Sequence, residues 1–448
     1  MKKISLSAEN KKYLRTTFVL ALPIILQELM SHSVNFVDML MVGQLSLEAI
    51  TGLGLSKRLF FLFILLVFGV NSGGAVFIGQ YWGKKDVTGI YRVIGIALTV
   101  NLFVSLIFAS VAFFAPRWFL SILTSNPAVI EEGARYLAVA GISYFLSAIS
   151  LTLLVALRSI RQTKIPMFAS ACALVTKVGI TFLFIFVLDL GIVGAAWGTV
   201  IARVIEISVQ VFLIKKHRLP ILTKLRQHFD FDFAYVKKFF KVTLPVMINE
   251  FMWALGIFMY EVAYQFTGTA GQGAFQISES FQHLFMISGI SIGAASGIMI
   301  ANHLGAGEKE AAVKYSRKCL VLGTVVTGIM AALLFFASPV IIAVYNVDVE
   351  VQQLAVSNLM VVALFMIPRT INYYFIISIL RQGGDTVFCL ILDISSVWLI
   401  GIPLAFLGAR VLGWPIYGVL AIVYLEEVVK FFIAGNRVRK NRWANKLV

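Results

Sequence analysis

Charged residues are scarce in this chain. Asp, Glu, Lys and Arg make up 13% of its 448 residues, and 59% are hydrophobic. A soluble domain carries about a quarter charged residues. The hydrophobic runs are long and do not alternate with polar residues, which excludes the pattern of a membrane β-barrel. Because one helix needs about 20 apolar residues to cross the hydrocarbon core, these runs predict a helical membrane protein.

Cysteine and histidine are also rare, and their spacing excludes several functions. The three cysteines, Cys172, Cys319 and Cys389, have no metal-binding spacing and imply no disulfide framework. The chain has no GxxxxGK[ST] motif, so uphill transport would draw on an ion gradient. No carboxylate pair lies beside a histidine at catalytic spacing. We therefore expect no enzyme, no metal site and no cofactor other than a transported H+ or Na+.

The chain contains twelve apolar runs, each long enough to span a membrane. They cover residues 16–42, 50–81, 91–115, 133–157, 166–188, 193–214, 239–266, 277–304, 319–345, 354–380, 387–407 and 416–434. The prediction is an all-α polytopic membrane protein with twelve transmembrane helices.

The distribution of positive charge predicts the orientation in the membrane. Most of the 38 Lys and Arg residues fall in the terminal segments and in every second loop, whereas the opposite face holds Arg117, Arg135 and Arg410. Positive residues mark the cytoplasmic side. Both termini are therefore expected in the cytoplasm, in the inner membrane of a prokaryote. The net charge of +16 then indicates contact with membrane lipids and not with nucleic acid.

The second half of the chain repeats features of the first at one fixed offset. Leu22-Pro23 returns as Leu244-Pro245, and Glu28 returns as Glu250. Each half has six runs, so the repeat is parallel, with an axis along the membrane normal. The predicted domains are an N-terminal six-helix lobe (1–218), a cytoplasmic linker (219–238) and a C-terminal six-helix lobe (239–448). Such duplication is typical of transporters.

Several motifs, taken in order, resemble the MATE (multidrug and toxin extrusion) family over the whole chain. They are Leu22-Pro23, the stretch from Asp38 to Gly43, Gly79-Gln80-x-x-Gly83, the turn from Leu380 to Thr386, and Asp393 followed by Trp398-x-x-Gly401-Ile402-Pro403. The resemblance implies two six-helix bundles in a V shape around a central cavity. It also implies export of mostly cationic, amphipathic compounds in exchange for Na+ or H+, by a protein we expect to be monomeric.

Two ion sites of the family do not transfer intact. Members that pair the first-helix aspartate with acidic and amide residues in helix 5 differ from this chain, which has Lys177 and no carboxylate from 174 to 181. Other members carry a helix 7 glutamate where this chain has Trp253, and here Glu250 comes three residues earlier.

Charged residues within the runs are the candidates for ion coupling, because each costs about 3 kcal/mol or more in the bilayer interior. Asp38 is either a proton or cation site or a structural partner of Lys57, Arg58 or Lys177. Glu250 either couples an ion or serves the fold, as its repeat Glu28 suggests. The predicted ion-coupling set is Asp38, Lys177, Glu250, Glu261, Arg369 and Asp393.

Aromatic residues near carboxylates are the candidates for substrate binding, because their faces attract organic cations. Trp253, Tyr260 and Tyr264 recur at helical spacing, and ordinary packing is the alternative for each. The predicted substrate set is Phe36, Trp253, Tyr260, Tyr264 and Glu279. Prolines within helices permit bending, so Pro23, Pro245 and Pro368 are predicted hinges; the alternative is a lipid-facing kink without function.

These features together predict a secondary active multidrug exporter. It would exchange amphipathic, mostly cationic molecules for H+ or Na+. The alternative is a flippase for lipid-linked oligosaccharides of the same superfamily, which the cationic residues Lys57, Arg58, Lys177 and Arg369 favour. The number of predicted helices opposes it.

Overall fold

The computed structural model describes residues 8–345 and 347–448, and every regular element in this part of the chain is a helix. The apolar runs predicted this all-helical fold. Lys2 and Lys3, which contribute to the N-terminal positive charge, lie outside the described residues.

The described helices account for twelve membrane crossings. Ten helical stretches are long and apolar enough to cross a membrane. One of them, Phe233–Gly305, holds two helices joined by the short turn η2 (Gln265–Thr267), after which Gly268 has φ +78°. The helix pair at the C-terminal end, Ile416–Val423 and Leu425–Arg439, supplies the remaining crossing. The predicted twelve-helix class is thereby confirmed.

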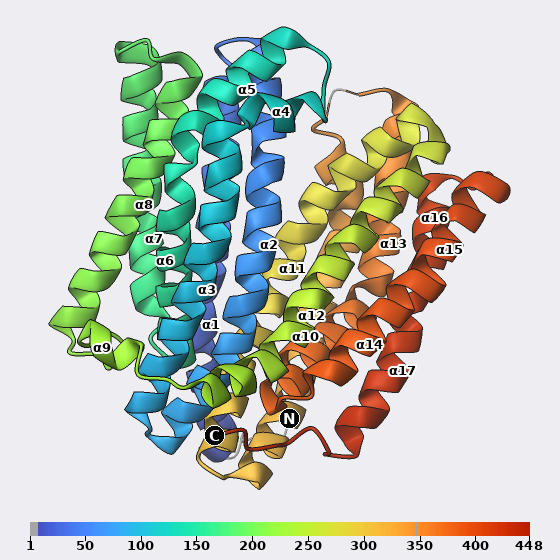
Figure 1. The fold of residues 1–448 in the computed structure, drawn as a ribbon. Coiled ribbons are helices and arrows are strands. Elements are labelled where there is room, and N and C mark those ends of the chain that lie inside the picture. Colours follow the sequence, from blue (N-terminus) through green and yellow to red (C-terminus); the bar gives the residue numbers. More distant parts are fainter. Residues whose placement is uncertain (1–7, 346) are drawn as a thin grey trace. The chain divides into compact units, whose positions relative to one another are not determined.

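The described residues divide into two compact units, which we call the N-unit and the C-unit. The N-unit runs from Leu26 to Met247. It contains the second part of α1 (Ala8–Val42) and the first part of α10 (Phe233–Tyr264). Its other elements are α2 (Leu47–Lys84), α3 (Val87–Phe114), α4 (Pro116–Ser121), α5 (Pro127–Ala140), α6 (Ile142–Ser159), α7 (Lys164–Phe182), η1 (Leu183–Val187), α8 (Gly191–Lys216) and α9 (Leu225–His228). Figure 1 shows α2 and α3 running side by side.

The C-unit comprises the residues up to Ile25 and those from Ile248 to Val448. After α10 and η2 it contains α11 (Gly268–Gly305), α12 (Lys309–Ile342), α13 (Val349–Tyr373), η3 (Tyr374–Leu380), η4 (Arg381–Gly383), α14 (Thr386–Ser396), η5 (Val397–Gly401), α15 (Ile402–Phe406), η6 (Leu407–Val411), α16 (Ile416–Val423) and α17 (Leu425–Arg439). Within this unit, α1 begins and α17 ends at the same end, as an even number of crossings requires (Figure 1).

The chain passes between the units inside two helices. It leaves the C-unit within α1, after Ile25, and returns within α10, after Met247. Pro23 and Pro245 lie just before these two points, inside the helices. Proline removes one backbone hydrogen bond and so permits a local bend. The two repeated prolines therefore lie next to the covalent links between the units, and their action as hinges stays a prediction.

Small residues and aromatic rings hold the N-unit helices together. A Cβ at Gly52 of α2 would lie 2.8 Å from the backbone nitrogen of Gly133 in α5, so only glycine allows this close approach. The rings of Phe63 and Tyr144 stack with centroids 5.1 Å apart. Side-chain caps begin two helices, since Ser46 accepts a hydrogen bond from Ala49 N–H and Asp86 accepts one from Gly89 N–H.

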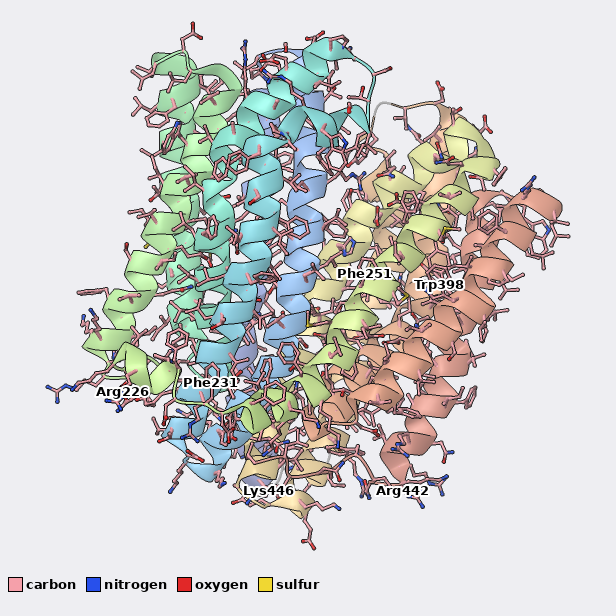
Figure 2. The ribbon with its side chains drawn as sticks, in the orientation of Figure 1. Arg226, Phe231, Phe251, Trp398, Arg442 and Lys446 are labelled. Carbon is pink, nitrogen blue, oxygen red and sulfur yellow. The ribbon has the colours of Figure 1, made fainter. Side chains whose placement is uncertain are left out.

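The basic segment at the middle of the chain packs against one end of α3 within the N-unit. Arg92 pairs with Asp230 at 3.0 Å, and His228 Nδ1 lies 3.1 Å from the carbonyl oxygen of Tyr91. Figure 2 shows Arg226 of α9 extending away from the helices, with Phe231 at the same end of this unit. The segment thus presents cationic side chains outward, while one ion pair and one hydrogen bond attach it to α3.

Candidate functional site

The N-unit contains a cavity of about 530 Å³. Six helices line it, and five of them supply Asp38 on α1, Lys57 on α2, Tyr136 on α5, Lys177 on α7 and Arg203 on α8. The remaining lining residues are Val34, Gly54, Ser56, Arg58, Phe60, Phe61, Ile64, Ala140, Ser143, Tyr144 and Thr199. Four cationic side chains therefore face one carboxylate.

Asp38 lies at the centre of an ion cluster in this cavity. One of its carboxylate oxygens, Oδ2, accepts from Lys177 Nζ at 2.9 Å and lies 3.2 Å from Lys57 Nζ. The other oxygen, Oδ1, is buried and has no hydrogen-bond partner among the described residues. Asp38 is 2% exposed and Lys177 is 4% exposed. The structural pairing of Asp38 that the sequence left open is thus present, with two lysines at once.

The sequence of α7 explains why a lysine points inward there. Lys177 follows Ala169 and Ala173 at intervals of one helical turn and precedes Thr181, and all four are buried. Small residues on this stripe let α7 approach α8 closely; a Cβ at Gly198 would lie 2.1 Å from Thr181 Oγ1. Lys177 also donates to Thr199 Oγ1 at 3.0 Å, so both neighbours satisfy its ammonium group.

A chain of hydrogen bonds continues from the cavity wall through the N-unit. Arg203 pairs with Glu206 at 2.5 Å. Glu206 accepts from Ser170, which in turn accepts from Gln27. Glu28, the first-half copy of Glu250, pairs with Arg158 at 3.0 Å. The buried Glu206 and the partly exposed Glu28 thus each have a cationic partner, which is the usual requirement for charge inside an apolar protein.

A second cavity, of about 140 Å³, lies within the C-unit. It brings together the predicted residues Trp253, Tyr260, Glu261 and Tyr264 of α10, Glu279 of α11, and Arg369 of α13. Its other lining residues are Ile257, Phe275, Gln282, His283, Val397, Leu420, Val423, Tyr424, Glu426 and Glu427. Four glutamates face one arginine, so the charge balance is the reverse of that in the N-unit cavity.

Two of these glutamates, and the lysine that pairs with them, were not among the residues predicted from the sequence. Tyr260 donates to Glu426 at 2.7 Å, and Lys430 lies 3.7 Å from Glu426 and 3.3 Å from Glu427. Asn372 donates to Glu427 at 2.7 Å. Lys430 follows Glu427 by three residues and Glu426 by four, which places all three side chains on one face of a helix. This pattern lies inside an apolar run, and it was the sequence signal that could have identified them.

Arg369 also lines the C-unit cavity, where its guanidinium group lies over an aromatic ring. Its guanidinium carbon is 4.7 Å from the ring centroid of Tyr424, and its Nη1 donates to the Tyr424 hydroxyl at 3.1 Å. Tyr424 donates onward to Gln282. The tyrosine thus holds the arginine in place beside the glutamates.

Glycine at position 401 allows the Tyr260–Glu426 contact to form. A Cβ there would lie 1.9 Å from the Tyr260 hydroxyl oxygen and 2.2 Å from Glu426 Oε2. Gly401 belongs to one of the family motifs that the sequence displayed, and its lack of a side chain leaves space for this hydrogen bond.

Glu250 lies outside both cavities and pairs with Arg381 at 2.8 Å. Arg381 is 1% exposed, and Glu250 is its ion-pair partner in the described part of the C-unit. Asp393 accepts from Asn249 at 2.9 Å. Next to it, Trp398 donates to the carbonyl oxygen of Met252, and Figure 2 shows Trp398 and Phe251 in this unit. Of the carboxylates predicted in the second half of the chain, Glu261 and Glu279 therefore line the C-unit cavity, whereas Glu250 and Asp393 lie outside it.

The remaining predicted residues lie apart from the two cavities. Phe36 on α1 is 64% exposed and does not line the N-unit cavity. Pro368 lies inside α13, next to Arg369. In the described residues, no group of three His, Cys, Asp or Glu side chains is arranged to hold a metal ion.

Comparison with known proteins identifies the family. The MatE family model matches residues 23–183 and 245–407, which is more than half of the chain and one segment in each half. The "Uncharacterized transporter YisQ" of Bacillus subtilis is 24% identical over 433 residues, covering 96% of this chain and 95% of that protein. The "Probable multidrug resistance protein NorM" of Thermotoga maritima is 20% identical over 439 residues, covering 93% and 91%.

A solved structure shares the fold. The MATE transporter VcmN of Vibrio cholerae, in a form described as bent, has a TM-score of 0.88 and 17% sequence identity, covering 96% of this chain and 97% of that one. The family match, the relatives and the twelve apolar crossings agree with the resemblance that the motifs carried. The chain is therefore a multi-pass membrane transporter of the MATE (multidrug and toxin extrusion) family.

Proposed function

We propose that this transporter exports amphipathic organic cations in exchange for H+ or Na+. The C-unit cavity is the observation that carries this proposal, because Glu261, Glu279, Glu426 and Glu427 line it together with aromatic rings. Carboxylates attract a cation by charge, and the faces of Trp253, Tyr260 and Tyr264 attract it through their ring quadrupoles. Such a cavity suits a positively charged molecule with an apolar body.

Exchange follows if the substrate and the coupling ion compete for the same carboxylates. A proton or Na+ bound to Glu426 or Glu427 cancels the charge that an organic cation needs. When two ligands exclude each other at one site, each lowers the affinity of the protein for the other. If the site opens to each side of the membrane in turn, an inward ion gradient then drives the substrate outward. Arg369 and Lys430 offset two of the four glutamate charges, so the cavity keeps an excess of negative charge that attracts a cation.

Other features support the same proposal. The relative from Thermotoga maritima is named a probable multidrug resistance protein. The sequence has no nucleotide-binding motif, which leaves an ion gradient as the energy source. The cationic side chains of Arg442 and Lys446 lie at the end of the C-unit where the chain terminates (Figure 2). By the positive-inside rule this end faces the cytoplasm, as we propose for both termini of an inner-membrane monomer.

Transport by purified protein in lipid vesicles tests the proposal. Vesicles loaded with ethidium would be diluted into medium of lower pH or higher Na+, and the loss of ethidium followed by fluorescence. We expect one of the two gradients to raise the efflux rate about tenfold or more over the rate without a gradient. Nigericin, which collapses the pH gradient, and monensin, which collapses the Na+ gradient, serve as controls. Equal efflux with and without both gradients would rule out an ion-coupled exporter.

A flippase for lipid-linked oligosaccharides is the second candidate. The N-unit cavity favours it, because Lys57, Arg58 and Lys177 line that cavity, although Arg369 lies in the other unit. A flippase would move a pyrophosphate-linked lipid and would give no gradient-driven ethidium efflux. The same vesicle experiment therefore distinguishes the two candidates.

A further inference from the structure

We propose that the N-unit cavity binds an organic anion, and that this binding and the protonation of Asp38 reinforce each other. The ligand class is an amphipathic molecule with a carboxylate, sulfonate or phosphate group. This site is separate from the cation site of the C-unit, so the inference does not depend on the proposed export of cations.

The charges around the cavity favour an anion. Lys57, Arg58, Lys177 and Arg203 line it, and Asp38 is the one carboxylate among the described lining residues. The Arg203 charge is shared with Glu206, at 2.5 Å. Arg58 is exposed at the cavity and makes no ion pair with any described residue. Positive charge therefore remains in excess after every ion pair is formed.

Asp38 occupies the position that the acidic group of a ligand would take. Its Oδ2 atom lies within 3.2 Å of both lysine ammonium groups. Its Oδ1 atom has no hydrogen-bond partner in the described part of the chain. A second anion near Lys57 and Lys177 would meet repulsion from an ionised Asp38, whereas a protonated Asp38 releases both lysines to bind it.

The walls of the cavity set the rest of the ligand chemistry. Phe60, Phe61, Ile64 and Tyr144 line it beside the charged groups. A volume of about 530 Å³ accommodates a small aromatic or aliphatic body with one acidic group. An amphipathic anion fits this division into apolar and cationic walls.

The sign of the pH dependence follows from the groups that face Asp38. These are Lys57 and Arg58 from α2, Tyr136 from α5, Tyr144 from α6, Lys177 from α7, and Arg203 with Glu206 from α8. A proton on Asp38 removes the internal competitor for Lys57 and Lys177, and an anion bound to these lysines in turn weakens the attraction that keeps Asp38 ionised. Protonation of a lysine acts in the same direction. Anion affinity should therefore rise as pH falls, and by linkage a bound anion favours proton uptake.

Binding to the full-length protein in phosphatidylcholine nanodiscs tests this inference. The probe is naphthalene-2-sulfonate, which is an anion at every pH used, and the matched control ligand is the neutral naphthalene-2-sulfonamide. Calorimetric titrations would be made at pH 5.5 and pH 8. We expect the sulfonate to bind about tenfold more tightly at pH 5.5, and the sulfonamide to bind weakly at both. Equal binding of the two ligands, or no effect of pH, would overturn the proposal.

Variants assign the effect to the cavity. Asp38→Asn should raise sulfonate affinity at pH 8 about tenfold and remove the pH dependence, and Lys177→Gln should lower affinity at pH 5.5 about tenfold. Lys216→Gln, which removes an exposed lysine at the end of α8 in the same unit, is the matched control and should change neither. If Asp38→Asn does not fold, Arg58→Gln provides the test, because this exposed side chain makes no ion pair with another described residue. An unchanged affinity in Arg58→Gln and Lys177→Gln would contradict the site.

Lipid composition distinguishes two sources of the anion. In nanodiscs doped with phosphatidylglycerol, competition with the sulfonate would show that a lipid phosphate occupies the cavity. Unchanged sulfonate affinity would show that the site takes free anions from solution. Both results require the same cationic cavity, and they differ only in where its ligand comes from.

Discussion

Replacing Glu426 and Glu427 together by glutamine is expected to reduce gradient-driven efflux of an organic cation by about 100-fold. Each carboxylate contributes attraction in a partly buried site, and a loss of about 1.4 kcal/mol per charge is a factor of ten in affinity. Lys430 lies within 3.7 Å of both glutamates. The double variant removes both ion-pair partners of Lys430, and the positive charge of this lysine then repels the substrate.

Efflux from vesicles, measured beside protein yield and thermal unfolding, checks this result. Glu310→Gln is the matched control, because Glu310 is exposed near the start of α12 and does not line the C-unit cavity. If the double variant unfolds early, the further change Lys430→Met removes the unpaired charge and restores a neutral cluster. A folded double variant that transports at the unmodified rate would exclude these glutamates from the site.

Replacing Arg381 by glutamine is expected to destabilise the protein by about 3–5 kcal/mol, because it leaves the carboxylate of Glu250 buried without its partner. The two side chains lie 2.8 Å apart, and the arginine is almost completely buried. For a unit of this size, such a loss lowers the midpoint of thermal unfolding by about 10 °C. Arg410→Gln, at an exposed position of the same unit, should leave the midpoint nearly unchanged.

The double variant Glu250→Gln/Arg381→Gln separates a structural role from ion coupling. A structural pair predicts that removing both charges restores most of the unfolding midpoint and most of the transport. Ion coupling by Glu250, which the sequence analysis also proposed, predicts a stable protein that no longer responds to the gradient. A double variant as unstable as Arg381→Gln alone would show that the pair is not the source of the stability.

The sequence predicts the helices well because the membrane imposes a length on each one. The runs 50–81 and 277–304 fall inside α2 and α11. The membrane sets no length for the breaks and irregular turns within helices, so the sequence has no hydrophobic pattern that predicts them. The break between α5 and α6 at Gly141 lies inside one predicted run, and the π-helical turns η3, η5 and η6 depend on packing that no local sequence reports.

The candidate sites were predictable only in part, since pairing across helices decides them. Asp38 and Lys177 stood out as isolated charges, and their contact was one of the alternatives considered. Glu426 and Glu427 were missed because two glutamates followed by a lysine at helical spacing resemble a solvated helix face. Only the fold brings Tyr260 and Asn372 to these glutamates, from helices far away in the chain.

Binding of tetraphenylphosphonium to the purified protein, measured over a range of pH and Na+ concentration, tests most directly whether substrate and coupling ion share one site. We expect the affinity for tetraphenylphosphonium to fall about tenfold as the concentration of the coupling ion, H+ or Na+, rises. Glu426→Gln/Glu427→Gln should abolish the binding, and with it this dependence. Affinity that stays the same at every pH and every Na+ concentration would contradict exchange through shared carboxylates.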